Sequence, residues 1–169
     1  MTNHELYMKE AVKEAGKAFE ADEVPVGAVI VHNKRVIARA HNQIKLLKDP
    51  TAHAEMIAVT QAANALRNER LNNCDIYVTI EPCPMCMGAL VLARVRNLIF
   101  GAEDSKTGAC GSVITIGADN KFNHKIRIYK GVLKDECASL IKNFFKNKRE
   151  EGSQWVLLKA GGRKEKVSH

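Results

Sequence analysis

The sequence predicts an α/β domain, in which helices pack against a central sheet. Segments with helical spacing of apolar residues alternate along the chain with short runs rich in β-branched residues. The chain has 169 residues and an apolar fraction of 46%, enough for one compact core. Neither a repeat nor a linker divides it, so we expect a single domain.

The first half of the chain predicts two helices and a hairpin. In residues 3–19, apolar side chains recur at near-helical spacing between Glu and Lys, which predicts an amphipathic helix. Two β-branched runs, 26–31 and 35–40, flank His32-Asn33-Lys34, a spacing typical of a hairpin. A polar loop to Thr51 follows. Residues 52–66 contain neither Gly nor Pro, which favours a second helix.

The second half continues the alternation. Pro84 suits the first position of a helix, and the apolar segment after it predicts a buried helix over 85–95. The tail beyond Gly152 is expected to be frayed, with at most one more short element at 155–158. We therefore expect a domain at 1–152 and a partly ordered tail at 153–169. The remaining predicted elements are strands at 75–80, 97–101 and 125–130, a Gly-rich loop at 102–117 and a helix from 134 to about 148.

Composition and charge indicate the location of the protein and the kind of partner it binds. No segment approaches the roughly 18 to 20 apolar residues that a bilayer span requires, and residues 1–10 are charged. We expect a cytoplasmic protein without membrane contact. The net charge is +7, but residues 121–169 carry 13 Lys and Arg against 5 Asp and Glu, a net +8. Such a region suits a polyanion such as RNA, although a solubilising tail would have the same composition.

Two of the five cysteines have the spacing of metal ligands. They stand in Cys83-Pro84-Met85-Cys86, and in a reduced compartment a CxxC pair binds metal or carries out redox chemistry more often than it forms a structural disulfide. Both thiols would lie on one side of a first helical turn. The other cysteines, Cys74, Cys110 and Cys137, are interpreted as packed or idle thiols.

His53 is the candidate third ligand, since it also lies at the predicted start of a helix. Unsatisfied backbone N–H groups and the helix dipole lower the cost of holding thiolates at such a position. Three protein ligands leave one corner of a tetrahedron open, which is typical of a catalytic zinc site. The sequence thus predicts one Zn²⁺ per subunit, held by His53, Cys83 and Cys86.

Glu55 is the candidate catalytic residue. It follows His53 by two positions, so on a regular helix the two side chains would diverge by roughly 200°. Both can face one pocket only if His53 lies at the edge of the helix. Glu55 could then carry protons between an attacking water, a ring nitrogen and departing ammonia.

The His53-Ala54-Glu55 and Pro82-to-Cys86 segments together form the HxE and PCxxC signature of zinc deaminases. Several further segments are similar to the bacterial tRNA-specific adenosine deaminases, within the cytidine and deoxycytidylate deaminase superfamily. The resemblance covers roughly residues 5–150. The segments that carry it are 23–29 (EVPVGAV), 49–55 (DPTAHAE), 77–83 (YVTIEPC), 100–102 (FGA), 106–109 (KTGA), 123–124 (NH) and 135–138 (DECA).

This resemblance implies a three-layer α/β/α, cytidine-deaminase-like domain with a central mixed sheet. It also implies a homodimer that converts the wobble adenosine of a tRNA anticodon stem-loop to inosine. Asn42 and the backbone around Ala54 would hold the purine edge, Val26 would pack against the ring, and Pro82 would also contact the substrate. Family positions expected near RNA are Asp104, Lys106, Asn123, His124, Phe144, Phe145, Lys148 and Arg149.

The residues alone leave other interpretations open. Without the family, Phe144 and Phe145 are interpreted as core residues, and His124 as an ordinary surface histidine. A free nucleobase or nucleoside deaminase acting on guanine, cytosine or cytidine would share the zinc and Glu55 chemistry. A non-catalytic zinc RNA-binding subunit is the alternative from another class, although such a subunit has no need of a proton carrier.

Overall fold

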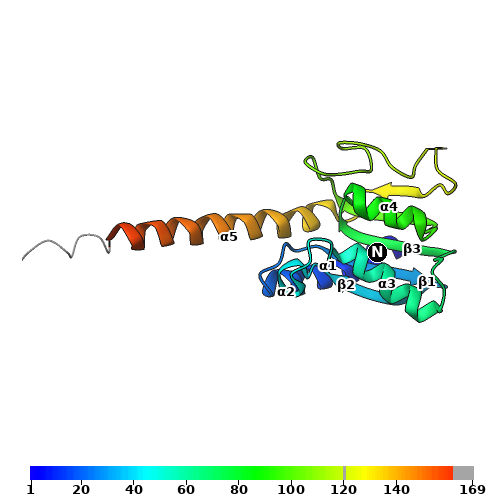
Figure 1. The fold of residues 1–169 in the computed structure, drawn as a ribbon, viewed down its shortest axis with the longest axis horizontal. Coiled ribbons are helices and arrows are strands. Elements are labelled where there is room, and N and C mark those ends of the chain that lie inside the picture. The colour runs from blue at the N-terminus through cyan, green and yellow to red at the C-terminus, as the bar shows by residue number, and fades with distance from the viewer. Residues whose placement is uncertain (120, 162–169) are drawn as a thin grey trace, which may run out of the picture.

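A five-stranded mixed sheet forms the centre of the protein (Figure 1). The computed structural model describes residues 1–119 and 121–161. The strand order is β2-β1-β3-β4-β5; β1 pairs antiparallel with both of its neighbours, while β3, β4 and β5 run parallel. The prediction of an α/β fold with a mixed sheet is confirmed. The strands are β1 (Gly27–His32), β2 (Arg35–His41), β3 (Cys74–Ile80), β4 (Asn97–Ala102) and β5 (Arg127–Lys130).

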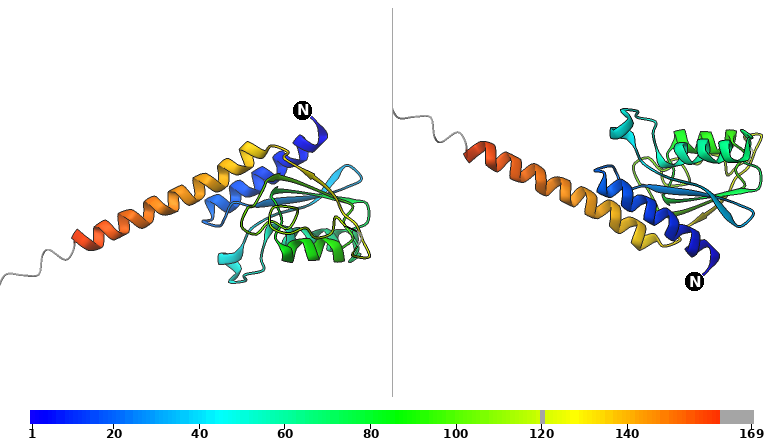
Figure 2. Two further views of the ribbon diagram at one scale, coloured as in Figure 1. Left: turned by 90° about the horizontal axis from the view of Figure 1, so that it is seen from above. Right: turned by 90° about the horizontal axis from the view of Figure 1, so that it is seen from below.

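Helices cover both faces of the sheet, which makes the three layers that the resemblance implies. The helices α1 (Asn3–Glu20) and α5 (Lys134–Gly161) run side by side on one face, and α3 (Ala54–Leu66) and α4 (Pro84–Leu92) cover the other (Figure 2). Side chains of β1 alternate between the two faces. Ile30 belongs to the apolar cluster under α3 and α4, and its neighbour Val29 to the cluster under α1.

Local signals in the sequence explain the first helix and the hairpin. Thr2 caps α1: its hydroxyl accepts from the backbone N–H of Glu5, and the Glu5 carboxylate accepts from the backbone N–H of Thr2. In the turn between β1 and β2, Asn33 and Lys34 both have positive φ, of 49° and 62°. Two left-handed residues match the twist of a two-residue hairpin, so the hairpin at 32–34 is confirmed.

One short helix was not predicted, and two helix boundaries differ from the prediction. The segment predicted as a polar loop to Thr51 contains a short helix, α2 (Ile44–Leu47). The helix predicted from residue 52 begins at Ala54, with His53 still extended. The helix predicted to reach Val95 ends at Leu92, because the chain reverses at Arg94 with φ of 56° and the Val95 N–H bonds back to the Leu90 carbonyl.

The largest difference lies at the C-terminal end. The prediction of a frayed tail after Gly152 is wrong for the described residues, since α5 continues to Gly161 and its second half extends away from the body (Figure 1). The segment has no Pro, and one exposed Gly costs only about 1 kcal/mol relative to Ala among good helix formers. Residues 162–169 of the predicted tail lie outside the described residues. Within 1–119 and 121–161, no helix is long and apolar enough to cross a membrane.

Candidate metal and substrate site

Two helix N-termini meet at the predicted ligand group. His53 is the N-cap of α3 and Cys83 the N-cap of α4, both with extended backbone, and Cys86 lies in the first turn of α4. The His53 Nδ1 atom is 3.7 Å from the Cys83 Sγ and 3.5 Å from the Cys86 Sγ. All three candidate ligand atoms lie within 4.8 Å of one another. The sequence-predicted ligands therefore converge.

This spacing fits a tetrahedral zinc ion. Zn–S bonds of about 2.3 Å and a Zn–N bond of about 2.0 Å place sulfur and nitrogen about 3.5 Å apart at the tetrahedral angle. The two nitrogen–sulfur distances match this value closely. Two thiols and one imidazole are also the soft and borderline donors that zinc prefers. The residues present thus fit the ion that the family implies.

The electrostatics of the group favour anionic sulfur. A hydrogen bond from the Cys86 thiol, together with the hydrogen bond to His53, lowers the pKa of Cys83 to about 4. The pKa of Cys86 is raised, because its thiol donates this hydrogen bond to Cys83 and because the thiol is buried. The hydrogen bond to Cys83 is also the main cause that raises the pKa of His53. One thiolate is therefore already stabilised by its neighbours at neutral pH.

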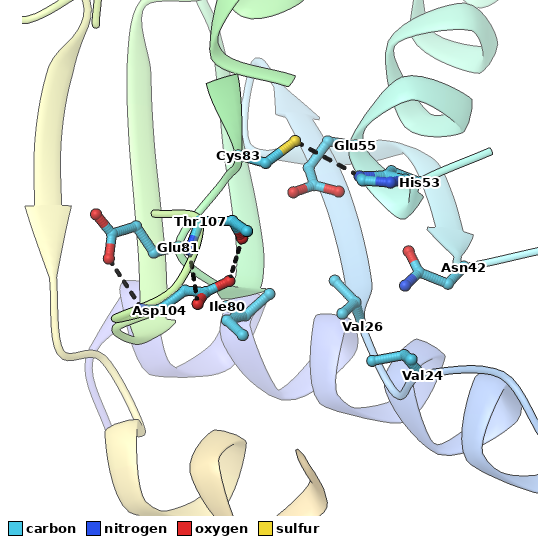
Figure 3. A pocket seen from close by; sticks show the side chains of 10 residues that line it. All are labelled: Val24, Val26, Asn42, His53, Glu55, Ile80, Glu81, Cys83, Asp104 and Thr107. Atoms are coloured by element: carbon cyan, nitrogen blue, oxygen red, sulfur yellow. Dashed lines mark hydrogen bonds between the residues drawn. The ribbon is translucent and has the colours of Figure 1, made fainter. Parts of the chain in front are cut away.

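Glu55 is buried beside the ligands. Its side chain is 3% exposed, and it extends from the first turn of α3 into the space between His53 and Cys83 (Figure 3). The extended backbone of His53 lets both side chains face that space, which meets the condition set by their spacing in the sequence. Burial raises the pKa of the Glu55 carboxyl to about 7.

A cavity of about 120 Å³ opens in front of this group. It lies at the carboxyl end of β3, where parallel strands in open α/β sheets commonly form ligand sites. Its walls combine apolar side chains with a few polar groups, as small-molecule sites generally do. The lining residues, labelled in Figure 3, are Val24, Val26, Asn42, His53, Glu55, Ile80, Glu81, Cys83, Asp104 and Thr107.

Asn42 lies in this wall and also secures the start of α3. It directly follows β2 and is 5% exposed, and its Oδ1 accepts the Ala54 N–H at 2.8 Å. That bond caps a helix whose N-cap residue makes no side-chain capping bond of its own. This bond fixes the orientation of the Asn42 amide group. It also uses the Ala54 N–H, which therefore has no hydrogen left to donate to a substrate. Ala54 and Pro82 are both buried, and neither is among the residues that line the cavity.

The loop after β4 closes one side of the cavity. Asp104 organises it locally: its carboxylate accepts from the Lys106 and Thr107 N–H groups and from the Thr107 hydroxyl. Burial raises the pKa of Asp104, but these hydrogen bonds outweigh it and hold the pKa below its usual value. The side chain of Lys106 is exposed beside them.

The other residues expected near RNA occupy different environments. Asn123 is exposed, but the half-buried His124 ring donates through Nε2 to the Val95 carbonyl at 2.6 Å and so fastens its loop to the body. Phe144 is 6% exposed and packs edge-on against Phe19 of α1, whereas Phe145 is 44% exposed. The interpretation as core is confirmed for Phe144 and wrong for Phe145, because only one of the two rings faces α1.

Lys148 and Arg149, the two candidate RNA-binding cations of α5, differ in their ion pairs. The Lys148 Nζ pairs with the carboxylates of Asp22 and Glu151 and lies 5.8 Å from the centre of the Phe144 ring. Arg149 is exposed, and within the described part of the chain its side chain makes no ion pair. Lys148 therefore helps attach α5 to the body, while the Arg149 guanidinium is available to solvent.

Several residues of the site have no role in the prediction from sequence. Val24, Ile80 and Thr107 line the cavity, and Glu81 is a 2% exposed carboxylate directly after β3. A charged residue directly after a buried strand needs hydrogen-bond or ion-pair partners. The position of Glu81 after the predicted strand 75–80 could therefore have identified it as a residue with such partners. The loop that supplies those partners could not be placed from spacing alone.

Comparison with known proteins agrees with this geometry. Residues 2–149 match the family model described as MafB19-like deaminase. A tRNA-specific adenosine deaminase of Bacillus subtilis is 48% identical over 151 residues, which cover 89% of this chain and 94% of that protein. Among solved structures, one from a study of A-to-I editing by tRNA:A34 deaminases at the wobble position superposes with a TM-score of 0.77, at 44% identity over 80% of this chain and 98% of that chain. A guanine deaminase of Bacillus subtilis is more distant, with a TM-score of 0.59 and 30% identity over 88% of this chain and 95% of that chain.

The three-layer fold and the family match thus define a deaminase with the cytidine deaminase-like fold. Within that class, the identity over nearly the whole chain places the protein more narrowly. The chain belongs to the family of tRNA-specific adenosine deaminases.

Proposed function

We propose that this protein hydrolyses the wobble adenosine of a tRNA anticodon to inosine and ammonia, with one zinc ion held by His53, Cys83 and Cys86. The observation that carries the proposal is the convergence of these three side chains beside the buried Glu55, in a chain 48% identical to a tRNA-specific adenosine deaminase. Zinc, when bound there, would lower the pKa of water at the site to about 7. The remaining chemistry falls to the residues of the chain.

Glu55 is the proton carrier in this proposal. It is not one of the three converging ligands, and its carboxylate projects into the cavity beside them (Figure 3). Glu55 takes a proton from the attacking water and gives it to a ring nitrogen of adenine. It then takes the remaining proton of the newly added hydroxyl group and delivers it to the amino group, which leaves as ammonia. The cavity walls exclude bulk water from these transfers.

The cavity orients the base between apolar and polar walls. Val26 and Ile80 provide apolar surfaces against which a flat ring can pack. The Asn42 Oδ1 is occupied by the Ala54 N–H, so the Asn42 amide nitrogen is the group left to donate to a ring acceptor. An unpaired loop base can enter such a closed site with little loss of stacking energy.

The RNA surface and the dimer are further parts of the proposal. The net +8 of residues 121–169 and the exposed Arg149 and Lys106 suit phosphate contacts. The homodimer is proposed from the family resemblance, and exposed Leu92, Val113 and Ile114 are apolar side chains that a partner subunit could cover. Light scattering across a range of protein concentrations tests the dimer.

The decisive experiment compares substrates. The pure protein is incubated with an anticodon stem-loop carrying a wobble adenosine and, separately, with guanine, cytosine and cytidine. Inosine in the stem-loop together with released ammonia is the expected result. Ammonia from the free bases or cytidine alone would identify a nucleobase or nucleoside deaminase instead, and RNA binding without ammonia would identify a non-catalytic RNA-binding subunit.

A further inference from the structure

Glu81 is a buried acid whose carboxylate accepts hydrogen bonds from the loop that closes the catalytic cavity. It stands between the end of β3 and Pro82-Cys83, and its side chain is 2% exposed. The backbone N–H of Glu81 donates to the Ala102 carbonyl at 2.8 Å, which fixes the residue at the end of the sheet. Its carboxylate faces away from the sheet, toward residues 104–112.

Four donors from that loop converge on the carboxylate. The Asp104 N–H reaches Oε2 at 2.9 Å, and the Cys110 and Ser112 N–H groups reach Oε1 at 2.9 Å and 3.1 Å. The Ser112 hydroxyl also donates to Oε2. A single side chain thus binds both ends of the segment 104–112.

The loop packs against the Glu81 carboxylate without room for a side chain at Gly108. A Cβ atom on Gly108 would lie 2.4 Å from the Glu81 carboxyl carbon and Oε2, and 2.5 Å from the Asp104 carbonyl. Only Gly lets the loop wrap this closely around the carboxylate. The Ala109 N–H, which donates to the Pro82 carbonyl at 2.9 Å, fastens the same loop to the residue before Cys83.

The loop held in this way forms part of the substrate site. Asp104 and Thr107 line the cavity, and Asp104 is both bonded to Glu81 through its N–H and responsible for the local turn through its carboxylate (Figure 3). Because both Glu81 oxygens already accept two hydrogen bonds each, Glu81 has a different task from Glu55. We infer that Glu81 is a positioning residue, which holds the 104–112 loop in place as a wall of the cavity and thereby sets how substrate binds.

This inference rests on the proposed function for its substrate and can be tested with Glu81→Gln. Glutamine keeps the size of the side chain but replaces one acceptor oxygen by an NH₂ group, so part of the donor set loses its partner. The matched control is Glu103→Gln: Glu103 lies in the same loop region, but its side chain is 46% exposed and pairs with Lys130 and Lys134. Ser112→Ala removes one donor from the opposite side of the same contact.

Three measurements are made on each zinc-loaded protein: zinc content, KM and kcat for the wobble-adenosine stem-loop, and amide hydrogen exchange. Losing a hydrogen bond to a buried charge predicts a rise in KM of roughly tenfold for Glu81→Gln, with a smaller fall in kcat. The Asp104, Cys110 and Ser112 amides should exchange roughly tenfold faster, while zinc content stays at the wild-type value. Ser112→Ala should change KM and exchange in the same direction by less, and Glu103→Gln should match the wild type.

Unchanged KM and unchanged exchange in Glu81→Gln would overturn the inference. So would a loss of activity that follows a loss of zinc in proportion, because Glu81 would then act on Cys83 rather than on the loop. If Glu81→Gln does not fold, Ser112→Ala decides: wild-type KM and exchange in that variant would count against the inference. If the wild-type protein makes no inosine, the proposed function fails, and the exchange measurement alone decides whether Glu81 holds the loop.

Discussion

The catalytic end of the sheet and the surface of α5 are built in opposite ways. At the catalytic end, His53, Cys83 and Cys86 come from two helix starts, and their ligand atoms lie within 4.8 Å of one another. On α5, the candidate RNA-binding side chains follow one another along a helix whose second half is exposed (Figure 2). The difference teaches that chemistry in this fold depends on a few preorganised atoms, whereas RNA binding must come from many separate contacts.

The largest expected effect comes from removing a ligand. Cys86→Ala should lose zinc and all measurable deamination, since a buried site with two ligands cannot hold the ion in place. Metal analysis of the purified protein and ammonia release measure the two effects. Cys110→Ser is the control, because Cys110 lies outside the converging group and should keep one zinc per subunit. A Cys86→Ala protein that retains full zinc would mean that the ion is bound elsewhere.

Glu55→Ala should separate metal binding from chemistry. Zinc content and affinity for the stem-loop should remain, while kcat falls by roughly 10²- to 10⁴-fold, the range typical of a lost acid–base group. Glu69→Ala, at an exposed loop position, should leave kcat unchanged. Loss of zinc in Glu55→Ala would show that Glu55 is a ligand or supports one.

The two regions also differ in how well the sequence predicted them. HxE and PCxxC each lie at the start of a helix, so the motifs predicted both the metal ligands and their position at two helix N-termini. The structure brings His53, Cys83 and Cys86 together as expected. The resemblance named Val26 and Asn42, and both line the cavity. The sequence could not add Ile80 and Thr107 to that wall, because they meet only through the sheet order and the loop that is bonded to Glu81.

The C-terminal region was predicted less well. Gly152 suggested an end to order, but its local cost is small compared with the helix propensity of its neighbours, and α5 passes through it. Phe144 and Phe145 are adjacent in the sequence, and only the packing of α5 against α1 shows which of the two is buried.

These two phenylalanines allow a test of where the core ends on α5. Phe144→Ala should lower the free energy of unfolding by about 3 kcal/mol, because it removes a buried ring packed against Phe19. Phe145→Ala, at a 44% exposed position, should cost less than about 1 kcal/mol. Urea denaturation measures both. Equal losses would mean that α5 packs differently in solution.

The smallest expected effects distinguish the two neighbouring cations. Arg149→Ala should reduce the slope of log affinity against log salt by about one unit for the stem-loop, as expected for one lost phosphate contact. Lys148→Ala should change the slope less, because Asp22 and Glu151 already neutralise its charge. Fluorescence anisotropy between about 50 and 200 mM salt resolves the slopes, and zinc content should not change in either variant. If Lys148→Ala gave the larger change, the ion pair with Asp22 would have to open when RNA binds, and the α5 surface would then be rearranged by its ligand instead of being preformed like the catalytic end.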